Sequence, residues 1–320
     1  MVSQQSVADL SVTDLRVAGA NIDLFGLLWR LPAGLVLDFL EQANAWEMRH
    51  SLARRLASTV EMVATPIAQT PALRDRSDQV ARECAEFFFR SNAALSALLV
   101  QLERGTAGPL EVQWQGVDNL RRAREGGRPV VVFAPHIGFL YAVPFALAVL
   151  GERSVSLTGE MTGDVLTRVF STMAPKLIES TSYILVPSPG CARAATDTLW
   201  RGGVLVVFPE VNYGATGNVQ AATTTFLGRT VWLPTMAARF ARIARADILP
   251  VLVTPDGPRR VRVELDDPVA APADRHADVA TSVRLFRWLE RVIEERPHLW
   301  WGWPLLDTKM RVAEVAAGRT

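Results

Sequence analysis

The sequence predicts an α/β fold, in which helices flank a mostly parallel central sheet and a helical region precedes that sheet. From about residue 109 onward, short apolar runs alternate with segments of helical periodicity, which is typical of a parallel sheet with both faces covered. Before that point, residues 24–104 carry apolar positions at three- and four-residue spacing and almost no strand pattern. We therefore expect one continuous structural domain, with an amino-terminal helical region over residues 1–105 and an α/β body over residues 106–320.

The first helical stretch is the most apolar part of the chain near its start. It covers residues 24–40, and Arg30, Pro32 and Asp38 interrupt it, so no uninterrupted run reaches the roughly 20 residues that a membrane span requires. We interpret it as an amphipathic helix that packs on the body, with a position at a membrane interface as the alternative. Packing would hide four leucines, namely Leu27, Leu28, Leu31 and Leu35.

The remaining elements follow from periodicity and from turn residues. Further helices of the amino-terminal region are expected at 49–63 and 78–102, with a proline-containing stretch between them. Strands are expected at 130–134, 154–157, 183–186, 204–208, 248–253 and 260–265. Helices of the body are expected at 117–125, 140–150, 165–174, 193–201, 235–244 and 281–295.

Composition excludes several classes of protein. The 320 residues carry a formal net charge of +1, so no overall basic field indicates a nucleic-acid partner. The chain has only two cysteines, Cys84 in a helical pattern and Cys191 directly after a Pro-Gly pair, which indicates neither a disulfide framework nor a metal cluster. The first twenty residues are polar and mixed and show no secretory signal. A reducing compartment, the cytoplasm, fits this pattern best.

The most informative segment is residues 130–138. Four apolar residues from Val130 to Phe133 predict a buried strand, Pro135 ends its pairing, and Gly138 permits a tight exit. His136 therefore stands at the carboxyl end of a strand, which is where open α/β sheets place their chemistry. A histidine that caps a helix or packs in the core is the alternative interpretation.

A second apolar strand ends in the same way. Residues 204–208 lead into Pro209 and the carboxylate of Glu210, so two parallel strands bring an imidazole and a carboxylate to one edge of the sheet. This combination suits a general base whose carboxylate orients either the imidazole or the substrate that donates the proton. A helix cap or a surface ion pair is the alternative for Glu210.

Residues after this strand are candidates for substrate contact. Asn212 and Tyr213 open a long segment rich in small and polar residues, which is either a substrate loop or an ordinary surface loop. Arg229 and Arg239 flank a helix start at Thr235, and arginine near a helix amino terminus suits a phosphate or carboxylate ligand. The alternative interpretation is that both arginines are ordinary surface charges. The tryptophan-rich segment 297–304 is interpreted as a cap on the core rather than a ligand wall.

The order of these segments resembles the bacterial lipid A biosynthesis acyltransferases of the lauroyl and myristoyl type, within the lysophospholipid acyltransferase superfamily. The resemblance runs from about Trp29 to Trp303. Residues 134–138 resemble the histidine motif of that family, which implies a catalytic role for His136 and a substrate contact at Gly138. The other similar blocks are residues 115–120, 127–131, 199–203, 226–229, 234–238, 251–268 and 296–301.

One position departs from the family pattern. The family has an Asp or Glu five residues after the histidine, which completes a His-carboxylate dyad, whereas this chain has Tyr141. Without a carboxylate, the imidazole lacks the partner that fixes its tautomer. Three interpretations are open. In the first, Glu210 substitutes for the missing carboxylate, and in the second, the acceptor is an amine or hydroxylamine that needs only a weak base. In the third, the chain has kept a binding cleft and lost the reaction. The first two are compatible. Tyr141 is then expected to donate a hydrogen bond in place of the carboxylate.

The resemblance implies an acyltransferase with His136 as general base. The donor would be a thioester on acyl carrier protein or coenzyme A, and the acceptor an amine or hydroxyl on a small molecule or lipid, in specialised-metabolite or lipid biosynthesis. Arg229 and Arg239 would contact donor phosphates. No metal or redox cofactor is implied. An aminoacyl ester as donor, a thioester hydrolase and a non-catalytic carrier-binding protein are the alternatives. The expected location is the cytoplasm, including a peripheral position at the inner membrane face.

Overall fold

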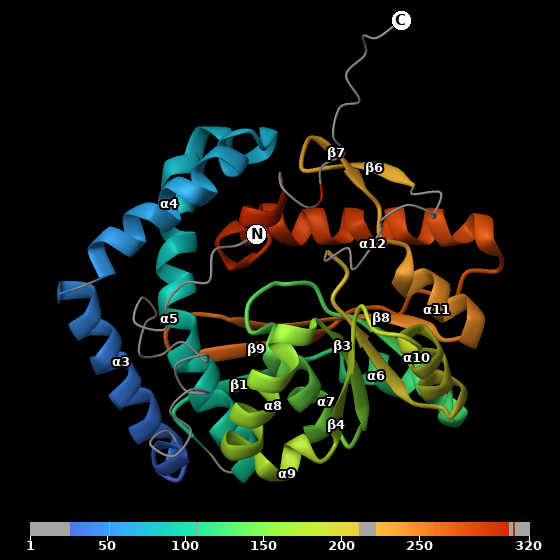
Figure 1. Cartoon of the computed structure of the whole chain (residues 1–320), viewed down its shortest axis with the longest axis horizontal. Helices are drawn as coiled ribbons and strands as arrows, with labels where there is room; N and C mark the ends of the chain where they lie inside the picture. Colours follow the sequence, from blue (N-terminus) through green and yellow to red (C-terminus); the bar gives the residue numbers. More distant parts are fainter. Residues whose placement is uncertain (1–25, 51, 106–107, 211–221, 307–309, 311–320) are drawn as a thin grey trace, which may run out of the picture.

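A seven-stranded sheet forms the centre of the chain in the computed structural model (Figure 1). The structure describes residues 26–50, 52–105, 108–210, 222–306 and 310. In order across the sheet, the strands are β1 (Glu111–Gln115), β9 (Arg260–Leu265), β8 (Asp247–Pro255), β2 (Val130–Phe133), β5 (Val204–Val207), β3 (Ser154–Thr158) and β4 (Thr181–Leu185). Neighbouring strands are parallel except for β8 and β9, which pair antiparallel. The expected α/β class with a mostly parallel sheet is confirmed.

Helices cover both faces of this sheet. Their bounds are α3 (Ala33–His50), α4 (Leu52–Ala68), α5 (Ser77–Arg104), α6 (Val117–Ala123), α7 (Val143–Val149), α8 (Glu160–Met173), α9 (Pro175–Ile178), α10 (Cys191–Trp200), α11 (Met236–Ala244), α12 (Arg275–Glu295) and α13 (Trp303–Leu305). None of the helices in the described part of the chain is both long enough and apolar enough to cross a bilayer.

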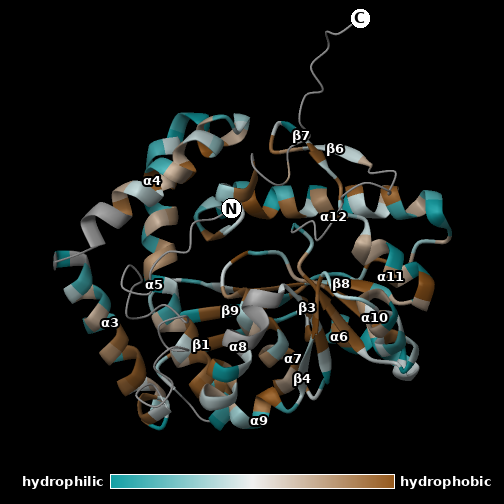
Figure 2. Cartoon of the chain, viewed as in Figure 1, coloured by the Kyte–Doolittle hydropathy of each residue, from teal (hydrophilic) through white to brown (hydrophobic). Residues whose placement is uncertain are grey.

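Two hydrophobic cores explain the unbroken apolar runs of the central strands. Val130 and Val132 pack into one core with side chains from α5, α7 and α8, whereas Val131 and Phe133 pack into the other with side chains from α10, α11 and α12. Successive side chains of a strand point to opposite faces, so a strand covered on both sides needs apolar residues at every position. In Figure 2, the central strands carry the brown colour of hydrophobic residues.

The connections of β2 and β5 create the position for a site. These two strands are neighbours in the sheet. The chain leaves β2 through α7 on the first face, and leaves β5 toward α11 on the opposite face. In open α/β sheets, a crevice forms at the carboxyl ends of such strands, and ligands bind there. The ends of β2 and β5 carry His136 and Glu210.

Helix α3 packs on α5 and α4, but the expected orientation of the first stretch was wrong. Helix α3 begins after Pro32 and buries Val36, Leu37 and Leu40, at most 1% exposed. Because a helix turns 100° per residue, the face opposite these residues points to solvent. On that face of α3, Leu35, Phe39 and Trp46 are 54%, 55% and 57% exposed. Leu27 and Leu31, which precede the helix, are 63% and 42% exposed, and Leu28 is half-buried. We call these five exposed residues the apolar strip.

Several elements differ from the sequence expectation, and the local reason is clear for β1, the β6–β7 hairpin and α12. Strand β1 was not anticipated, because it is a five-residue edge strand with polar residues at alternate positions. The hairpin β6 (Thr223–Phe226) and β7 (Arg229–Trp232) was not anticipated either, although its two-residue turn contains Gly228 at φ +77°. Helix α12 starts earlier than expected, because the Asp274 carboxylate accepts the backbone N–H groups of the first turn.

Candidate active site

The loop after β2 holds His136 in a fixed backbone conformation. The His136 carbonyl accepts the N–H of Trp301 at 2.8 Å, and the Gly138 N–H donates to the Leu299 carbonyl at 2.9 Å. Gly138 has φ +60°, and a Cβ at this position would lie 2.5 Å from the Val253 carbonyl oxygen. Glycine is therefore required here by the close approach of β8, so Gly138 has a structural role. The expected substrate contact of Gly138 stays a prediction.

Glu210 meets His136 directly. Its Oε2 lies 3.0 Å from His136 Nδ1, and its Oε1 accepts the His136 backbone N–H at 2.7 Å. The Glu210 side chain is 2% exposed, whereas the His136 side chain is 21% exposed. A buried carboxylate needs hydrogen-bond donors around it, and these contacts supply them. The expectation that the two strand ends bring an imidazole and a carboxylate together is confirmed as geometry.

This arrangement determines the tautomer of the imidazole. An ionised carboxylate only accepts hydrogen bonds, so Nδ1 of His136 carries the proton. The lone pair of the neutral ring is then on Nε2, the nitrogen on the far side from Glu210. Phe208 lies beside the ring, with the two ring centres 5.5 Å apart. The partly exposed ring, oriented from behind by a buried carboxylate, is the arrangement of a general base.

Tyr141 occupies a different environment. Its ring lies 6.1 Å from Phe170 of α8, and it also lies near Tyr183 of β4, whose pKa burial raises to about 12. In the described part of the chain, no hydrogen bond joins Tyr141 to His136. The dyad partner of the imidazole is therefore Glu210, and the expected hydrogen bond from Tyr141 in place of the missing carboxylate is not observed.

Arg229 has a structural role that the sequence did not reveal. It is 8% exposed, and its guanidinium donates to the Pro66 carbonyl at 2.8 Å, to Gln69 Oε1 at 3.1 Å and to Thr70 Oγ1 at 3.3 Å. The last turn of a helix has carbonyls without intrahelical partners, and a cation stabilises it. Arg229 thus joins the hairpin to the end of α4, which corrects the expectation of a donor-phosphate contact.

Arg239 and Thr235, which were also singled out from the sequence, are not brought to the dyad. Arg239 is exposed on α11, and Thr235 precedes that helix without a side-chain cap. No hydrogen bond of the described atoms joins either of them to His136 or Glu210. Asn212 and Tyr213 lie outside the described residues.

Two tryptophans of the site were missed as functional residues. Trp300, which is fully buried, donates its indole N–H to Glu210 Oε1 at 3.0 Å. Trp301 donates its indole N–H to the Gly138 carbonyl at 2.9 Å. The sequence interpretation of this segment as a core cap is right for its packing, but a buried indole N–H also needs an acceptor. That requirement was the available signal, although it does not identify the acceptor.

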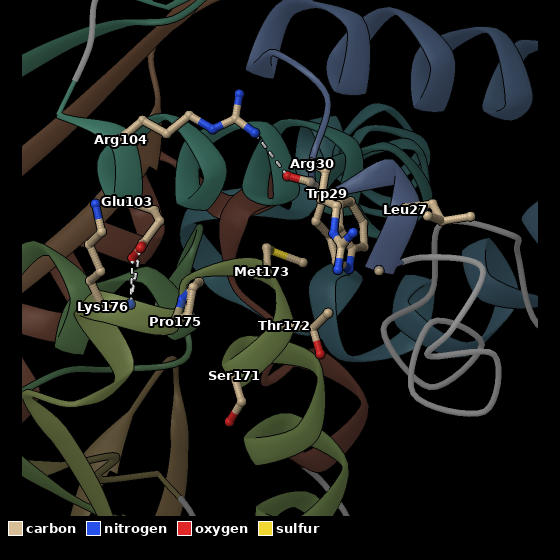
Figure 3. A pocket seen from close by; sticks show the side chains of 11 residues that line it. Leu27, Trp29, Arg30, Glu103, Arg104, Ser171, Thr172, Met173, Pro175 and Lys176 are labelled. Carbon is tan, nitrogen blue, oxygen red and sulfur yellow. Dashed lines mark hydrogen bonds between the residues drawn. The ribbon is translucent and has the colours of Figure 1, made fainter.

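A cavity of about 690 Å³ lies away from the dyad, where the start of the described chain meets the ends of α5 and α8 (Figure 3). Arg104 donates to the Trp29 carbonyl there, and the Glu103 carboxylate accepts N–H groups at the start of α9. Helix α8 runs back from the carboxyl end of β3 toward the amino end of β4, so this cavity lies at the opposite edge of the sheet from His136.

Comparisons with known proteins add no assignment. No protein-family model matches the chain, and no curated protein matches it.

Proposed function

We propose that the chain is an acyltransferase that moves an acyl group from a thioester to an amine or hydroxyl. The observation that carries this proposal is the hydrogen bond between the buried Glu210 carboxylate and His136 Nδ1, at the carboxyl edge of a parallel sheet. A base at this place needs the Nδ1–H tautomer, and the dyad supplies it. The resemblance of the sequence blocks to the lipid A acyltransferases names the reaction class.

The proposed chemistry uses one proton acceptor. Nε2 of His136 takes the proton from the acceptor O–H or N–H as that atom attacks the thioester carbonyl carbon. The negative charge of Glu210 stabilises the imidazolium that forms. Collapse of the tetrahedral intermediate breaks the C–S bond, and the imidazolium returns its proton to the leaving sulfur. The products are an ester or amide and a free thiol.

The position of the carboxylate distinguishes this chain from the family that it resembles. Glu210 comes from the next strand of the sheet rather than from the residue five positions after the histidine. This geometry supports the interpretation that Glu210 substitutes for the missing dyad carboxylate. An amine or hydroxylamine acceptor is compatible with the same dyad. Loss of the reaction is disfavoured, because a complete dyad is present at the sheet edge.

The donor and acceptor classes rest on the resemblance. We propose acyl carrier protein or coenzyme A as the carrier of the thioester, a small molecule or lipid as acceptor, and specialised-metabolite or lipid biosynthesis as the setting. Asn212, Tyr213 and Arg239 stay candidates for substrate contact. A net charge of +1 argues against a nucleic-acid partner. An aminoacyl ester is the alternative donor.

The apolar strip bears on the location. We propose that the protein is cytoplasmic and makes a peripheral contact with the inner face of the membrane through this strip. Exposed large apolar side chains on a helix and in the segment just before it are typical of interfacial contact. Arg30 and Asp38 next to the strip are also exposed, and charges near a helix centre cost about 2.5–3.5 kcal/mol in hydrocarbon, which favours a surface position over insertion.

The decisive experiment supplies purified protein with acyl thioesters, with and without candidate acceptors. Product that carries the acyl group on the acceptor supports the proposal. Release of free acid without dependence on any acceptor indicates a hydrolase, and stoichiometric binding without turnover indicates a carrier-binding protein. A series of acyl-CoA, acyl carrier protein and aminoacyl-tRNA donors separates the donor classes. Mass spectrometry of ligands that co-purify with the protein narrows the acyl chain and the acceptor.

A further inference from the structure

Trp300 contacts the dyad through Glu210 and not through the imidazole. Its indole N–H and the His136 backbone N–H both donate to Oε1 of Glu210, at 3.0 and 2.7 Å. Oε2 is then left for Nδ1 of His136, at 3.0 Å. The two donors on Oε1 fix the rotation of the carboxylate about its last bond, and this rotation decides whether Oε2 faces the imidazole.

We propose that Trp300 is a positioning residue of the dyad. The inference rests on the proposed function where activity is the readout, but the geometry that it explains is independent of the substrate. Charge-assisted hydrogen bonds to a buried carboxylate are stronger than bonds between neutral groups. The indole N–H therefore both stabilises the ionised Glu210 and holds it in the orientation that keeps the proton on Nδ1.

The segment that carries Trp300 is itself firmly held. The Pro297 carbonyl accepts the thiol of Cys84 at 3.6 Å. Burial raises the pKa of the Cys84 thiol, so it stays protonated and able to donate. The ring of Trp301 stacks on Phe88 of α5, with centres 4.4 Å apart and planes 5° apart. Helix α5 and the core thus fix the segment from behind.

The same segment holds the other half of the dyad. Its Leu299 carbonyl and the N–H groups of Trp301 bind the backbone of His136 and Gly138. One short stretch of chain therefore contacts the histidine loop and the carboxylate together, and it sets their relative position. This explains how a carboxylate from β5 serves a histidine after β2.

Replacement of Trp300 by Phe keeps an aromatic ring and removes the donor. We expect kcat to fall about 10- to 100-fold, the effect of losing one hydrogen bond to a buried charge. KM should change little, because Trp300 is fully buried and does not reach the substrate. The matched control is Trp303→Phe. Trp303 is equally buried, its ring lies 4.9 Å from that of Trp300, and its N–H donates to a backbone carbonyl instead of Glu210.

A double-mutant cycle tests whether Trp300 acts through Glu210. In a Glu210→Gln background, Trp300→Phe should add little further loss, because the charge that it positions is already gone. A loss as large as in the wild-type background would overturn the proposal. So would equal losses for Trp300→Phe and Trp303→Phe in folded proteins.

Nitrogen NMR of the imidazole supplies a readout that does not need activity. The chain has four histidines, so their two-bond proton–nitrogen spectra are resolvable. Wild type and Trp303→Phe should show the Nδ1–H tautomer for His136, and Trp300→Phe should show a mixture of tautomers. An unchanged tautomer would overturn the proposal. If wild type transfers no acyl group, the proposed function fails while this measurement still decides the role of Trp300. Should Trp300→Phe not fold, benzothienylalanine at position 300 keeps the bicyclic shape without the N–H.

Discussion

Replacing Glu210 by Gln should abolish the general-base function of His136 without disturbing the fold, and the geometry of the dyad explains why. Two N–H donors point at Oε1, so the amide oxygen of a glutamine must take that position. The amide NH₂ group then takes the position of Oε2, 3.0 Å from Nδ1 of His136. Two donors cannot face each other, so the imidazole moves its proton to Nε2 and its lone pair turns to the glutamine.

The expected loss is large. The analogous carboxylate-to-amide change in the Ser-His-Asp triad leaves the geometry intact and costs about 10⁴-fold in kcat, because the imidazole holds the wrong tautomer. We expect a similar loss of kcat/KM for Glu210→Gln, with the melting temperature close to that of wild type, since the buried donors keep their acceptor. Tyr141→Phe, the matched control at the position of the family carboxylate, should have a much smaller effect.

The assay is steady-state acyl transfer with the thioester and acceptor identified in the first screen. Circular dichroism of each variant confirms the fold. A folded Glu210→Gln protein that keeps more than about a tenth of the wild-type kcat/KM, a barrier change of only about 1.4 kcal/mol, would refute the assignment of Glu210 as dyad carboxylate.

Three further predictions follow from other parts of the chain. His136→Ala should lower turnover about 10²–10⁴-fold while the protein stays folded, and wild-type turnover by that folded variant contradicts the mechanism. Arg229→Met should destabilise the protein by roughly 1–3 kcal/mol in a denaturant titration, because buried acceptors at the end of α4 lose their hydrogen-bond donor. KM for the thioester should stay unchanged. A raised KM with normal stability would instead support a contact between Arg229 and the acyl donor. Leu35→Ser with Phe39→Ser should weaken sedimentation with lipid vesicles, and wild type should leave native membranes in a high-salt carbonate wash; retention that only detergent relieves would show an integral anchor.

Local pattern was sufficient for the central sheet and for the two strand ends. Val130 to Phe133 and Val204 to Val207 are apolar at every position, which is what burial on both faces demands, and each run stops at a proline. Edge strand β1 and hairpin β6–β7 were not predicted, because edge strands need no unbroken apolar run and four-residue strands carry little periodicity.

Helical periodicity located the amino-terminal helices but not the face that each buries. The leucines at 31 and 35 and the buried set at 36, 37 and 40 both recur at helical spacing. A stretch rich in apolar residues all round has no unique inner face, so packing against α5 and α4 decided which face is buried. The same limit applies to Arg229, whose acceptors at Pro66 and Thr70 lie some 160 positions earlier in the chain.

The sequence by itself determined that an imidazole and a carboxylate stand at the carboxyl ends of two parallel strands, because an apolar run and the proline that ends it are local features of the chain. Only the tertiary structure decided that β2 and β5 are neighbours, that Glu210 therefore reaches Nδ1 of His136, and that Trp300 reaches Glu210 from 90 residues away. Strand order and the docking of the carboxyl-terminal segment depend on how the two cores fill, and contacts between residues far apart in the chain leave no periodic trace in it.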